Sequence, residues 1–310
     1  MYKNFENKLD EIYRRLNGKK IIIWGWQRQG KILYLWLKSK NRKVEQIIDN
    51  NRATIETGRL KNYQILEYYD PAEIMILVTP SRNIDGIEQE ISRYGYSGKN
   101  LIYIRPYFYG DEERLVDYYS YLDFSKGVDI APVKSMDEQS YGIADKSEFH
   151  NYSPNVGMML EYTLSMFKFT DQDAAFDFGC GKGGALTLFH KNGVGKIGGI
   201  EYDQELFEIA KNNMKKLNLP CQLLHGDAAE CRDIDDYNIF YMFDPFVGDT
   251  FDRVIHNISE SHERNKRKIT IIYSAARCHS IIIDYAKFKL TYQIDNPFVF
   301  NGYTNIYICE

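Results

Sequence analysis

The sequence predicts an α/β protein of two domains, each built on a largely parallel β-sheet with helices between the strands. The 310-residue length favours two domains, because single domains usually span about 100–200 residues. Short apolar runs of strand length alternate with segments of helical periodicity, which is typical of βαβ units. A glycine-rich turn joins a strand to a helix twice, at residues 25–30 and 179–184, so each half of the chain contains one such unit.

The first domain is expected at residues 1–125. The run from strand through glycine turn and helix to a strand ending at Asp49 resembles the start of a Rossmann nucleotide-binding domain. It is similar to the small Rossmann-like domains attached to enzymes of sugar-nucleotide and surface-polysaccharide metabolism. The expected elements are helix 5–16, strand 20–24, helix 31–40, strand 44–48, strand 74–78, helix 84–94, strand 101–104 and helix 111–124.

Gln27 distinguishes this first turn from a dinucleotide-binding fingerprint. It stands where a middle glycine would let the backbone approach a pyrophosphate, and its side chain crowds that position. Two interpretations stay open. The domain is free of cofactor and serves dimerisation or shapes a substrate cleft, or it binds a ligand at Gly25, Gly30 and Asp49.

Residues 126–150 are expected to form an interdomain linker or a lid. Helical and strand periodicity are lost there, polar residues dominate, and Pro132 interrupts any regular element. A structureless stretch of this length is uncommon inside a compact domain, so the domain boundary is placed here.

The second domain is expected at residues 151–310. A buried strand leads into Asp177-x-Gly179-x-Gly181-x-Gly183, and the next strand ends at Glu201. Glycines let a ligand approach the backbone without a Cβ in the way, and an acid at the second strand end can accept both hydroxyls of a ribose. Gly184 also completes a dinucleotide spacing with Gly179 and Gly181, so the glycines alone do not decide the cofactor.

Asp177 ahead of the glycines, with Glu201 at the next strand end, resembles the class I S-adenosylmethionine-dependent methyltransferases. The resemblance extends to a β-hairpin around Asn301-Gly302 and implies a seven-stranded sheet with an antiparallel last strand. A dehydrogenase sheet would instead finish parallel. The expected elements are helices 154–168, 185–190, 205–217, 250–261 and 278–288, and strands 174–178, 196–201, 221–225, 237–243, 268–273, 290–294 and 303–309.

The resemblance implies S-adenosyl-L-methionine as the cofactor. It implies that Asp227 accepts from the adenine amino group and that the backbone of Ala228 meets a ring nitrogen, with a helix N-cap as the alternative for Asp227. Tyr152 would close over the methionine part of the cofactor, with a plain capping segment as its alternative. The expected cofactor-binding residues are Tyr152, Asp177, Gly179, Cys180, Gly181, Gly183, Glu201, Asp227 and Ala228.

Asp244, Pro245 and Phe246 follow the fourth strand of this domain and are the candidate catalytic residues. They resemble the (Asp/Asn)-Pro-Pro-(Tyr/Phe) motif of amino-group methyltransferases, although this sequence has one proline. The resemblance implies that Asp244 acts as a hydrogen-bond acceptor or as a base for the target atom. A simple turn into the next helix is the alternative.

The predicted function is methyl transfer from the cofactor to a nitrogen or oxygen atom of a small molecule or glycan. Two other classes are weighed against it. A nucleotide-sugar or NAD-linked enzyme acting through the first domain is disfavoured by Gln27. A non-catalytic scaffold with a relic pocket is disfavoured by the intact set of Asp177, Glu201 and Asp227.

Composition narrows the partners. The net charge of −4 disfavours a nucleic acid acceptor. The basic run 264–268 is expected to be an exposed loop, with a phosphate contact as the alternative. Lys182 is expected to be solvated. A homo-oligomer formed through the first domain is compatible with the sequence.

Cysteine, histidine and apolar patterns indicate a cytoplasmic protein without a metal. The five cysteines form no C-x-x-C pair, and free thiols suit a reducing compartment. None of the six histidines has a metal-ligand spacing. No apolar run approaches the roughly 18–20 residues of a membrane span, and the polar start does not resemble a signal peptide.

Overall fold

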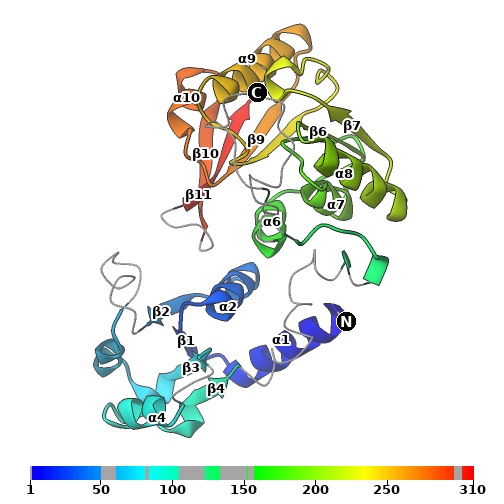
Figure 1. The fold of residues 1–310 in the computed structure, drawn as a ribbon. Helices are drawn as coiled ribbons and strands as arrows, with labels where there is room; N and C mark the ends of the chain where they lie inside the picture. Colours follow the sequence, from blue (N-terminus) through cyan, green and yellow to red (C-terminus); the bar gives the residue numbers. More distant parts are fainter. Residues whose placement is uncertain are drawn as a thin grey trace. The chain divides into compact units, whose positions relative to one another are not determined.

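The protein is an α/β chain of two compact units, Met1–Tyr121 and Leu122–Glu310 (Figure 1). Each unit has its own β-sheet, which confirms the predicted fold class of two Rossmann-like domains. The second unit includes residues 122–132, ahead of its glycine-rich motif. The computed structural model describes residues 2–49, 61–80, 84–104, 122–123, 125–132, 152, 157–296 and 302–310.

The first unit contains a four-stranded sheet in the order β2-β1-β3-β4, and all its strand pairs are parallel. The predicted strands are present, whereas the predicted helix 111–124 falls almost entirely outside the described residues. The strands are β1 (Lys20–Trp24), β2 (Val44–Ile48), β3 (Ile74–Val78) and β4 (Leu101–Tyr103), and the α-helices are α1 (Tyr2–Leu16), α2 (Arg28–Ser39) and α4 (Ile84–Ser92).

The Gly25 loop after β1 is shaped by contacts within its own unit. Gly25 has φ +102°, and a Cβ on Gly30 would lie 2.0 Å from the carbonyl oxygen of Gly25. The backbone N–H of Trp26 donates to Asp49 Oδ2 at 2.7 Å, and the Trp26 side chain is buried. Close backbone packing therefore accounts for both glycines without a ligand.

The second unit contains a seven-stranded sheet in the order β10-β11-β9-β8-β5-β6-β7. Strand β11 pairs antiparallel with both β9 and β10, and the remaining pairs are parallel, as predicted. The strands are β5 (Ala174–Phe178), β6 (Lys196–Glu201), β7 (Cys221–His225), β8 (Ile239–Phe243), β9 (Ile269–Ser274), β10 (Lys289–Asn296) and β11 (Gly302–Cys309).

Helices cover both faces of this sheet, because right-handed crossovers run in opposite directions from β5. Helices α7 and α8 pack beside β5, β6 and β7, and α9 packs beside α10 (Figure 1). The apolar residues of β8 and β9 are buried between these layers. The helices are α6 (Gly157–Leu164), α7 (Gly184–Lys191), α8 (Gln204–Lys216), α9 (Gly248–Arg264) and α10 (His279–Asp284).

The strand order reverses between β5 and β8, which lie side by side in the middle of the sheet. In open α/β sheets, ligands bind at the carboxyl ends of the strands beside such a reversal. The glycine-rich loop follows β5 there, and Asp244 follows β8. The fold therefore brings both predicted motifs to one edge of the sheet.

Candidate functional site

The glycine-rich loop after β5 turns sharply into α7. Gly179, Gly181 and Gly183 have φ values of +75°, +53° and +84°, a region that residues with a side chain enter at a cost. The backbone N–H groups of Gly179 and Cys180 both donate to the carbonyl oxygen of Ile200 at 3.0 Å. The loop is thus fixed to the end of β6. The Cys180 thiol is buried, which raises its pKa well above its usual value and leaves it inert.

Glu201 is the last residue of β6, and its carboxylate holds the loop from the other side. Oε2 accepts the N–H of Gly181 and Oε1 accepts the N–H of Asp203, each at 2.8 Å. Burial raises the pKa of Glu201 to about 7, although these backbone donors favour the ionised form. A carboxylate can accept about four hydrogen bonds in all, so acceptor capacity remains there for a ribose hydroxyl.

Asp177 lies within β5 and is 4% exposed. Among the described residues, no group donates a hydrogen bond to its carboxylate. Burial and, second, the nearby Glu201 raise the pKa of Asp177 well above its usual value. Two neighbouring buried carboxylates without a cation between them fit a ligand that carries positive charge.

Asp227 follows β7, at the neighbouring strand end. Its Oδ1 accepts the N–H of Ala229 at 2.8 Å, which caps the short 3₁₀ turn Ala228–Glu230. The predicted N-cap is therefore present, and Oδ2 is left for a ligand donor. The N–H of Gly226 donates to the carbonyl of Glu201, so the two strand ends stay in register.

Tyr152 lies against the glycine-rich loop. Two of its ring carbons would be 2.3 and 2.5 Å from a Cβ on Gly181, so that position accepts only glycine. The Tyr152 hydroxyl donates to the carbonyl of Ile130 at 2.7 Å, and burial raises the pKa of this phenol well above its usual value. The ring therefore covers the loop at the residue whose N–H binds Glu201.

Lys182 corrects a prediction, because its side chain is buried instead of solvated. Its Nζ donates to Asp129 Oδ1 at 2.8 Å and to the carbonyl of Pro132 at 3.0 Å. The same ammonium lies 5.3 Å from the centre of the Tyr152 ring, within the range of a cation–π contact. Residues 129–132 thus reach the glycine-rich loop.

The Asp244-Pro245-Phe246 segment lies against the same loop. Asp244 has φ +43°, an unusual conformation for a residue other than glycine and one that clusters at functional sites. A Cβ on Gly179 would lie 2.5 Å from Cβ of Pro245. Phe246 is 3% exposed and packs beside Phe251 in the core. Asp244 and Pro245 therefore adjoin the predicted cofactor site, whereas the Phe246 side chain packs into the core.

Arg277 is a site residue that sequence reasoning missed. Its Nη2 lies 2.6 Å from Asp244 Oδ2, and its Nε donates to Asp244 Oδ1 at 3.0 Å. This two-point hydrogen bonding to Asp244 raises the pKa of the guanidinium. The signal was the pairing of β8 with β9, since both residues closely follow those strands.

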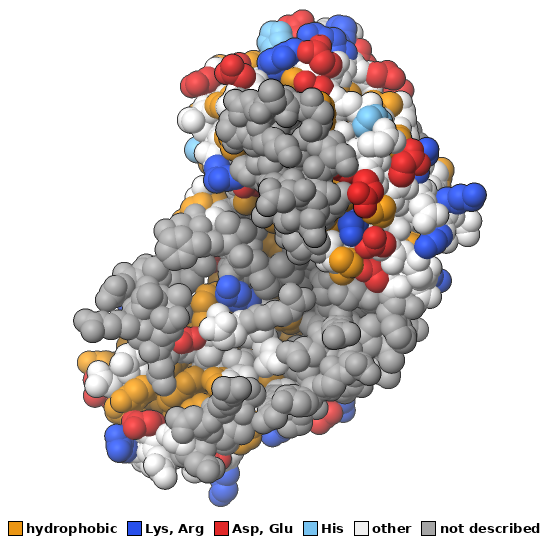
Figure 2. Space-filling view, viewed as in Figure 1, with side chains coloured by type: hydrophobic (Ala, Val, Ile, Leu, Met, Phe, Trp, Pro, Cys, Tyr) orange, Lys and Arg blue, Asp and Glu red, His pale blue; other side chains and the backbone are white. Residues whose placement is uncertain are grey.

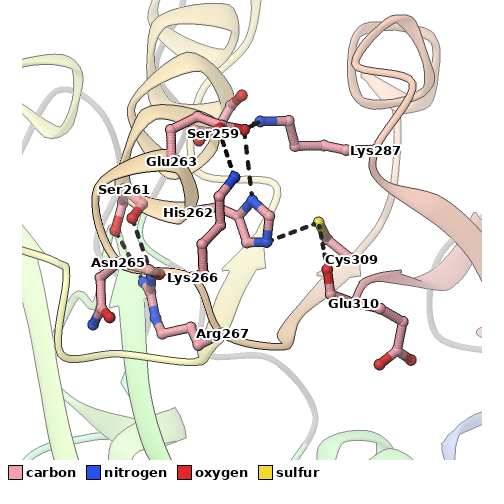
Figure 3. A network of polar contacts seen from close by, with 10 residues as sticks. All are labelled: Ser259, Ser261, His262, Glu263, Asn265, Lys266, Arg267, Lys287, Cys309 and Glu310. Carbon is pink, nitrogen blue, oxygen red and sulfur yellow. Dashed lines mark hydrogen bonds and ion pairs between the residues drawn. The ribbon is translucent and has the colours of Figure 1, made fainter.

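The basic run 264–268 is mostly exposed at the end of α9, as predicted, and its side chains are paired within their own unit. Arg267 donates to carbonyl groups of its own unit, including that of Tyr237 at 2.6 Å. Figure 3 shows this guanidinium hydrogen-bonded to Ser261 and, separately, the His262–Cys309 pair, in which Nε2 and Sγ are 3.5 Å apart. The other ion pairs of the run are Arg264 with Asp235, Lys266 with Glu263 and Lys268 with Glu310.

The visible surface carries charges of both signs. Figure 2 shows Lys and Arg side chains interspersed with Asp and Glu over the described part of this face. Within the described ranges, no three His, Cys, Asp or Glu side chains gather as metal ligands. No helix among those residues has both the length and the apolar character needed to cross a bilayer.

One comparison with known proteins matches the part of the chain that contains this site. A family model described as a methyltransferase domain matches residues 175–278. That match spans the glycine-rich loop, Glu201, Asp227, Asp244 and Arg277. A search of curated proteins found no match.

Three solved structures illustrate the structural similarity. An RNA methyltransferase from Salinibacter ruber in complex with S-adenosyl-L-homocysteine has 15% identity over 50% of this chain and 93% of that chain, with a TM-score of 0.38. A SAM-dependent methyltransferase from Aquifex aeolicus has 16% identity over 49% of this chain and 89% of that chain, with a TM-score of 0.38. The ribosomal protein L11 methylase from Lactobacillus delbrueckii subsp. bulgaricus has 12% identity over 48% of this chain and 76% of that chain, with a TM-score of 0.38. Similarity at this level says nothing about the acceptor.

Proposed function

Since the carboxy-terminal half of this chain carries a class I S-adenosylmethionine-dependent methyltransferase domain, we propose that it methylates a nitrogen or oxygen atom of a small molecule or glycan. The observation that carries the proposal is the contact between Pro245 and Gly179. It puts Asp244 beside the glycine-rich loop, at the point where the strand order reverses.

The cofactor is held by the buried carboxylates and the bare backbone of the loop. Glu201 accepts the ribose hydroxyls, and Oδ2 of Asp227 accepts from the adenine amino group beside the N–H of Ala228. Asp177 has no cationic partner among the described residues, so it balances the positive charge of the ligand. Tyr152 covers the loop at Gly181.

When bound, S-adenosylmethionine supplies a methyl group already activated by its sulfonium, so the task of the protein is alignment. Holding an acceptor atom in line with that group contributes on the order of 7–11 kcal/mol. Asp244 accepts a hydrogen bond from the N–H or O–H of the acceptor and so turns its lone pair toward the methyl group.

Arg277 favours this role for Asp244 over that of a base. Both carboxylate oxygens of Asp244 already accept charge-assisted bonds from the guanidinium. Taking up a proton would weaken this pair, whereas accepting one more hydrogen bond leaves it intact. The ion pair also fixes the rotamer of Asp244, which in-line transfer requires.

The net charge of −4 supports a small molecule or glycan over nucleic acid, because a phosphate backbone is bound through an excess of cations.

Calorimetry on the full chain with S-adenosylhomocysteine, NAD and a nucleotide sugar tests the cofactor class. Binding of S-adenosylhomocysteine alone is expected, and binding of NAD alone would overturn the proposal. Incubating cell extract with methyl-tritiated S-adenosylmethionine then tests the acceptor class. Label is expected in the small-molecule or glycan fraction, and label confined to nucleic acid or protein would contradict that assignment.

A further inference from the structure

Residues 122–123 and 125–132, here called the 122–132 segment, are held together by their own hydrogen bonds. The Asp123 carboxylate accepts the N–H groups of Ile130 and Ala131, each at 2.8 Å. The carbonyl of Ile130 accepts the Tyr152 hydroxyl. Since one acid and one phenol engage three backbone groups of consecutive residues, the chain at 130–131 has a defined conformation.

Asn213, on α8, joins this turn to the glycine-rich loop. Its Oδ1 accepts the N–H of Asp129 at 3.0 Å, and its Nδ2 donates to the carbonyl of Asp129 at 2.9 Å. The same Nδ2 donates to the carbonyl of Lys182 at 3.0 Å. Asn213 is 1% exposed, so water cannot reach its amide group and these protein groups are its hydrogen-bond partners.

The Lys182 side chain also joins the glycine-rich loop to the 122–132 segment. Its side chain is 5% exposed and that of Asp129 is 50% exposed. A buried ammonium requires a carboxylate or several carbonyls, and here both acceptors, Asp129 and Pro132, belong to the 122–132 segment. The loop therefore depends on this segment to satisfy the charge that it buries.

These contacts reach the backbone that faces the cofactor. Lys182 follows Gly181, whose N–H donates to Glu201 and where an added Cβ would lie 2.3 Å from a ring carbon of Tyr152. A shift of the segment would move Tyr152 through its bond to Ile130 and the loop through Lys182. The Tyr152 ring and the glycine-rich loop around Gly181 would therefore shift together.

We infer that residues 122–132 complete the cofactor pocket, with Asp129, Lys182 and Asn213 as positioning residues. The segment precedes the residues matched by the methyltransferase family model, 175–278. This inference rests on the proposed pocket around Gly181 and Glu201. The rival explanation is that the segment only adds stability to the unit, in which case losing its contacts lowers the unfolding temperature without a specific effect on the ligand.

Three variants of the full chain test the inference: Lys182→Met, Asp129→Asn and the double variant. The probe is S-adenosylhomocysteine, measured by calorimetry, with the unfolding midpoint recorded without ligand. We expect each single variant to bind about 5–20-fold more weakly at a temperature where it is fully folded. Asp129→Asn keeps the shape of the side chain, so it provides the test if Lys182→Met does not fold.

The double variant separates affinity from stability. Removing the buried ammonium together with its carboxylate leaves no unpaired charge, so the unfolding midpoint should recover toward that of the parent protein. The affinity should stay weak, because nothing then ties residue 129 to the loop side chain. Recovery of both quantities together would show that the pair acts on stability alone, and the inference would be wrong.

Lys216→Met is the matched control. Lys216 also lies on α8, and its hydrogen bond among the described residues goes to the carbonyl of Gly127 in the same segment and not to the glycine-rich loop. The affinity of the Lys216→Met variant for S-adenosylhomocysteine should stay within twofold of that of the parent protein. The inference is overturned if Lys182→Met and Asp129→Asn bind as tightly as this control. If the parent protein does not bind S-adenosylhomocysteine, the proposed function fails first and this inference with it.

Discussion

Glu201 accepts the backbone N–H of Gly181 at 2.8 Å, so the acid at the end of β6 holds the loop that follows β5. From the sequence alone, the Glu201 carboxylate was expected only to accept hydrogen bonds from the ribose hydroxyls. In the structure it shapes the glycine-rich loop first and keeps acceptor capacity for a ligand. Loop geometry and cofactor affinity are therefore coupled through one side chain.

Glu201→Gln should weaken binding of S-adenosylhomocysteine by roughly ten- to a hundredfold. An amide keeps one acceptor oxygen and turns an NH₂ group toward a backbone donor. Calorimetry measures the change. Glu208→Gln on α8, an exposed acid paired with Lys211, is the control and should bind as the parent does. Equal affinities for the two variants would remove Glu201 from the site.

Cofactor affinity should rise with pH up to about 7. Burial raises the pKa of Glu201 from 4.5 to about 7, with Asp203 adding to the shift and the N–H groups of Asp203, Gly181 and Tyr202 opposing it. Hydroxyl donors favour the ionised carboxylate, so binding below pH 7 releases a proton, and affinity rises by up to about tenfold per pH unit.

The sign of the stability effect follows from the same shift. Between about pH 4.5 and 7 the folded protein binds more protons at Glu201 than the unfolded chain does, so this group's contribution to stability falls as pH rises through that window. Calorimetry in two buffers of different ionisation enthalpy counts the protons released on ligand binding. Glu201→Gln should release fewer, and Asp177, whose pKa is also raised, accounts for the remainder. Unchanged release would contradict the assignment.

Gly179→Ala should destabilise the second unit by more than backbone strain alone. Its φ of +75° costs a side chain about 1–2 kcal/mol. The new Cβ would also lie 2.5 Å from Pro245, and overpacking adds about 1–3 kcal/mol. Urea unfolding measures both contributions together.

Gly127→Ala is the matched control for Gly179→Ala. It has a similar φ of +64° in the same unit, and nothing lies within 4 Å of its added Cβ. Strain alone, about 1–2 kcal/mol, is expected there. If both glycines cost the same, the approach of Pro245 to Gly179 is not a close contact in solution.

Local sequence patterns were sufficient to predict the strands, the loop and the acids at the strand ends. Short buried strands and a glycine turn are written in neighbouring residues, and Glu201 and Asp227 are simply the acids at or just after those strands. The antiparallel β11 was also predictable, because Asn301-Gly302 between two apolar runs indicates a hairpin. The fold class therefore followed from these local patterns, and the antiparallel last strand followed from the resemblance to class I methyltransferases.

Contacts between distant residues were not predictable in this way. Lys182 looked solvated because its partner Asp129 stands 53 residues earlier. Arg277 stands 33 residues after Asp244 and carries no motif of its own. The ion-pair partners of the basic run, Asp235 for Arg264 and Glu310 for Lys268, were likewise not readable from neighbouring residues. In each case the two charged residues are far apart in the sequence and close together only in the folded chain.

Asp244→Asn should separate methyl transfer from cofactor binding. Asparagine presents one acceptor oxygen and loses the charge that Arg277 holds, so transfer should fall about 10²-fold or more. Arg277→Met should also lower transfer, because Asp244 then loses its fixed rotamer. Affinity for S-adenosylhomocysteine should stay within about threefold in both variants, since neither side chain is placed among the cofactor-binding residues.

The measurement is tritiated methyl incorporation into whichever extract fraction the parent protein labels. Arg253→Met is the control, since it breaks an exposed ion pair with Glu230 in the same unit, and it should label at the parent rate. If Asp244→Asn and Arg253→Met label equally, Asp244 only forms the turn into α9. If Asp244→Asn loses transfer while Arg277→Met keeps it, the carboxylate acts without a fixed rotamer, and the alignment role proposed for the ion pair is wrong.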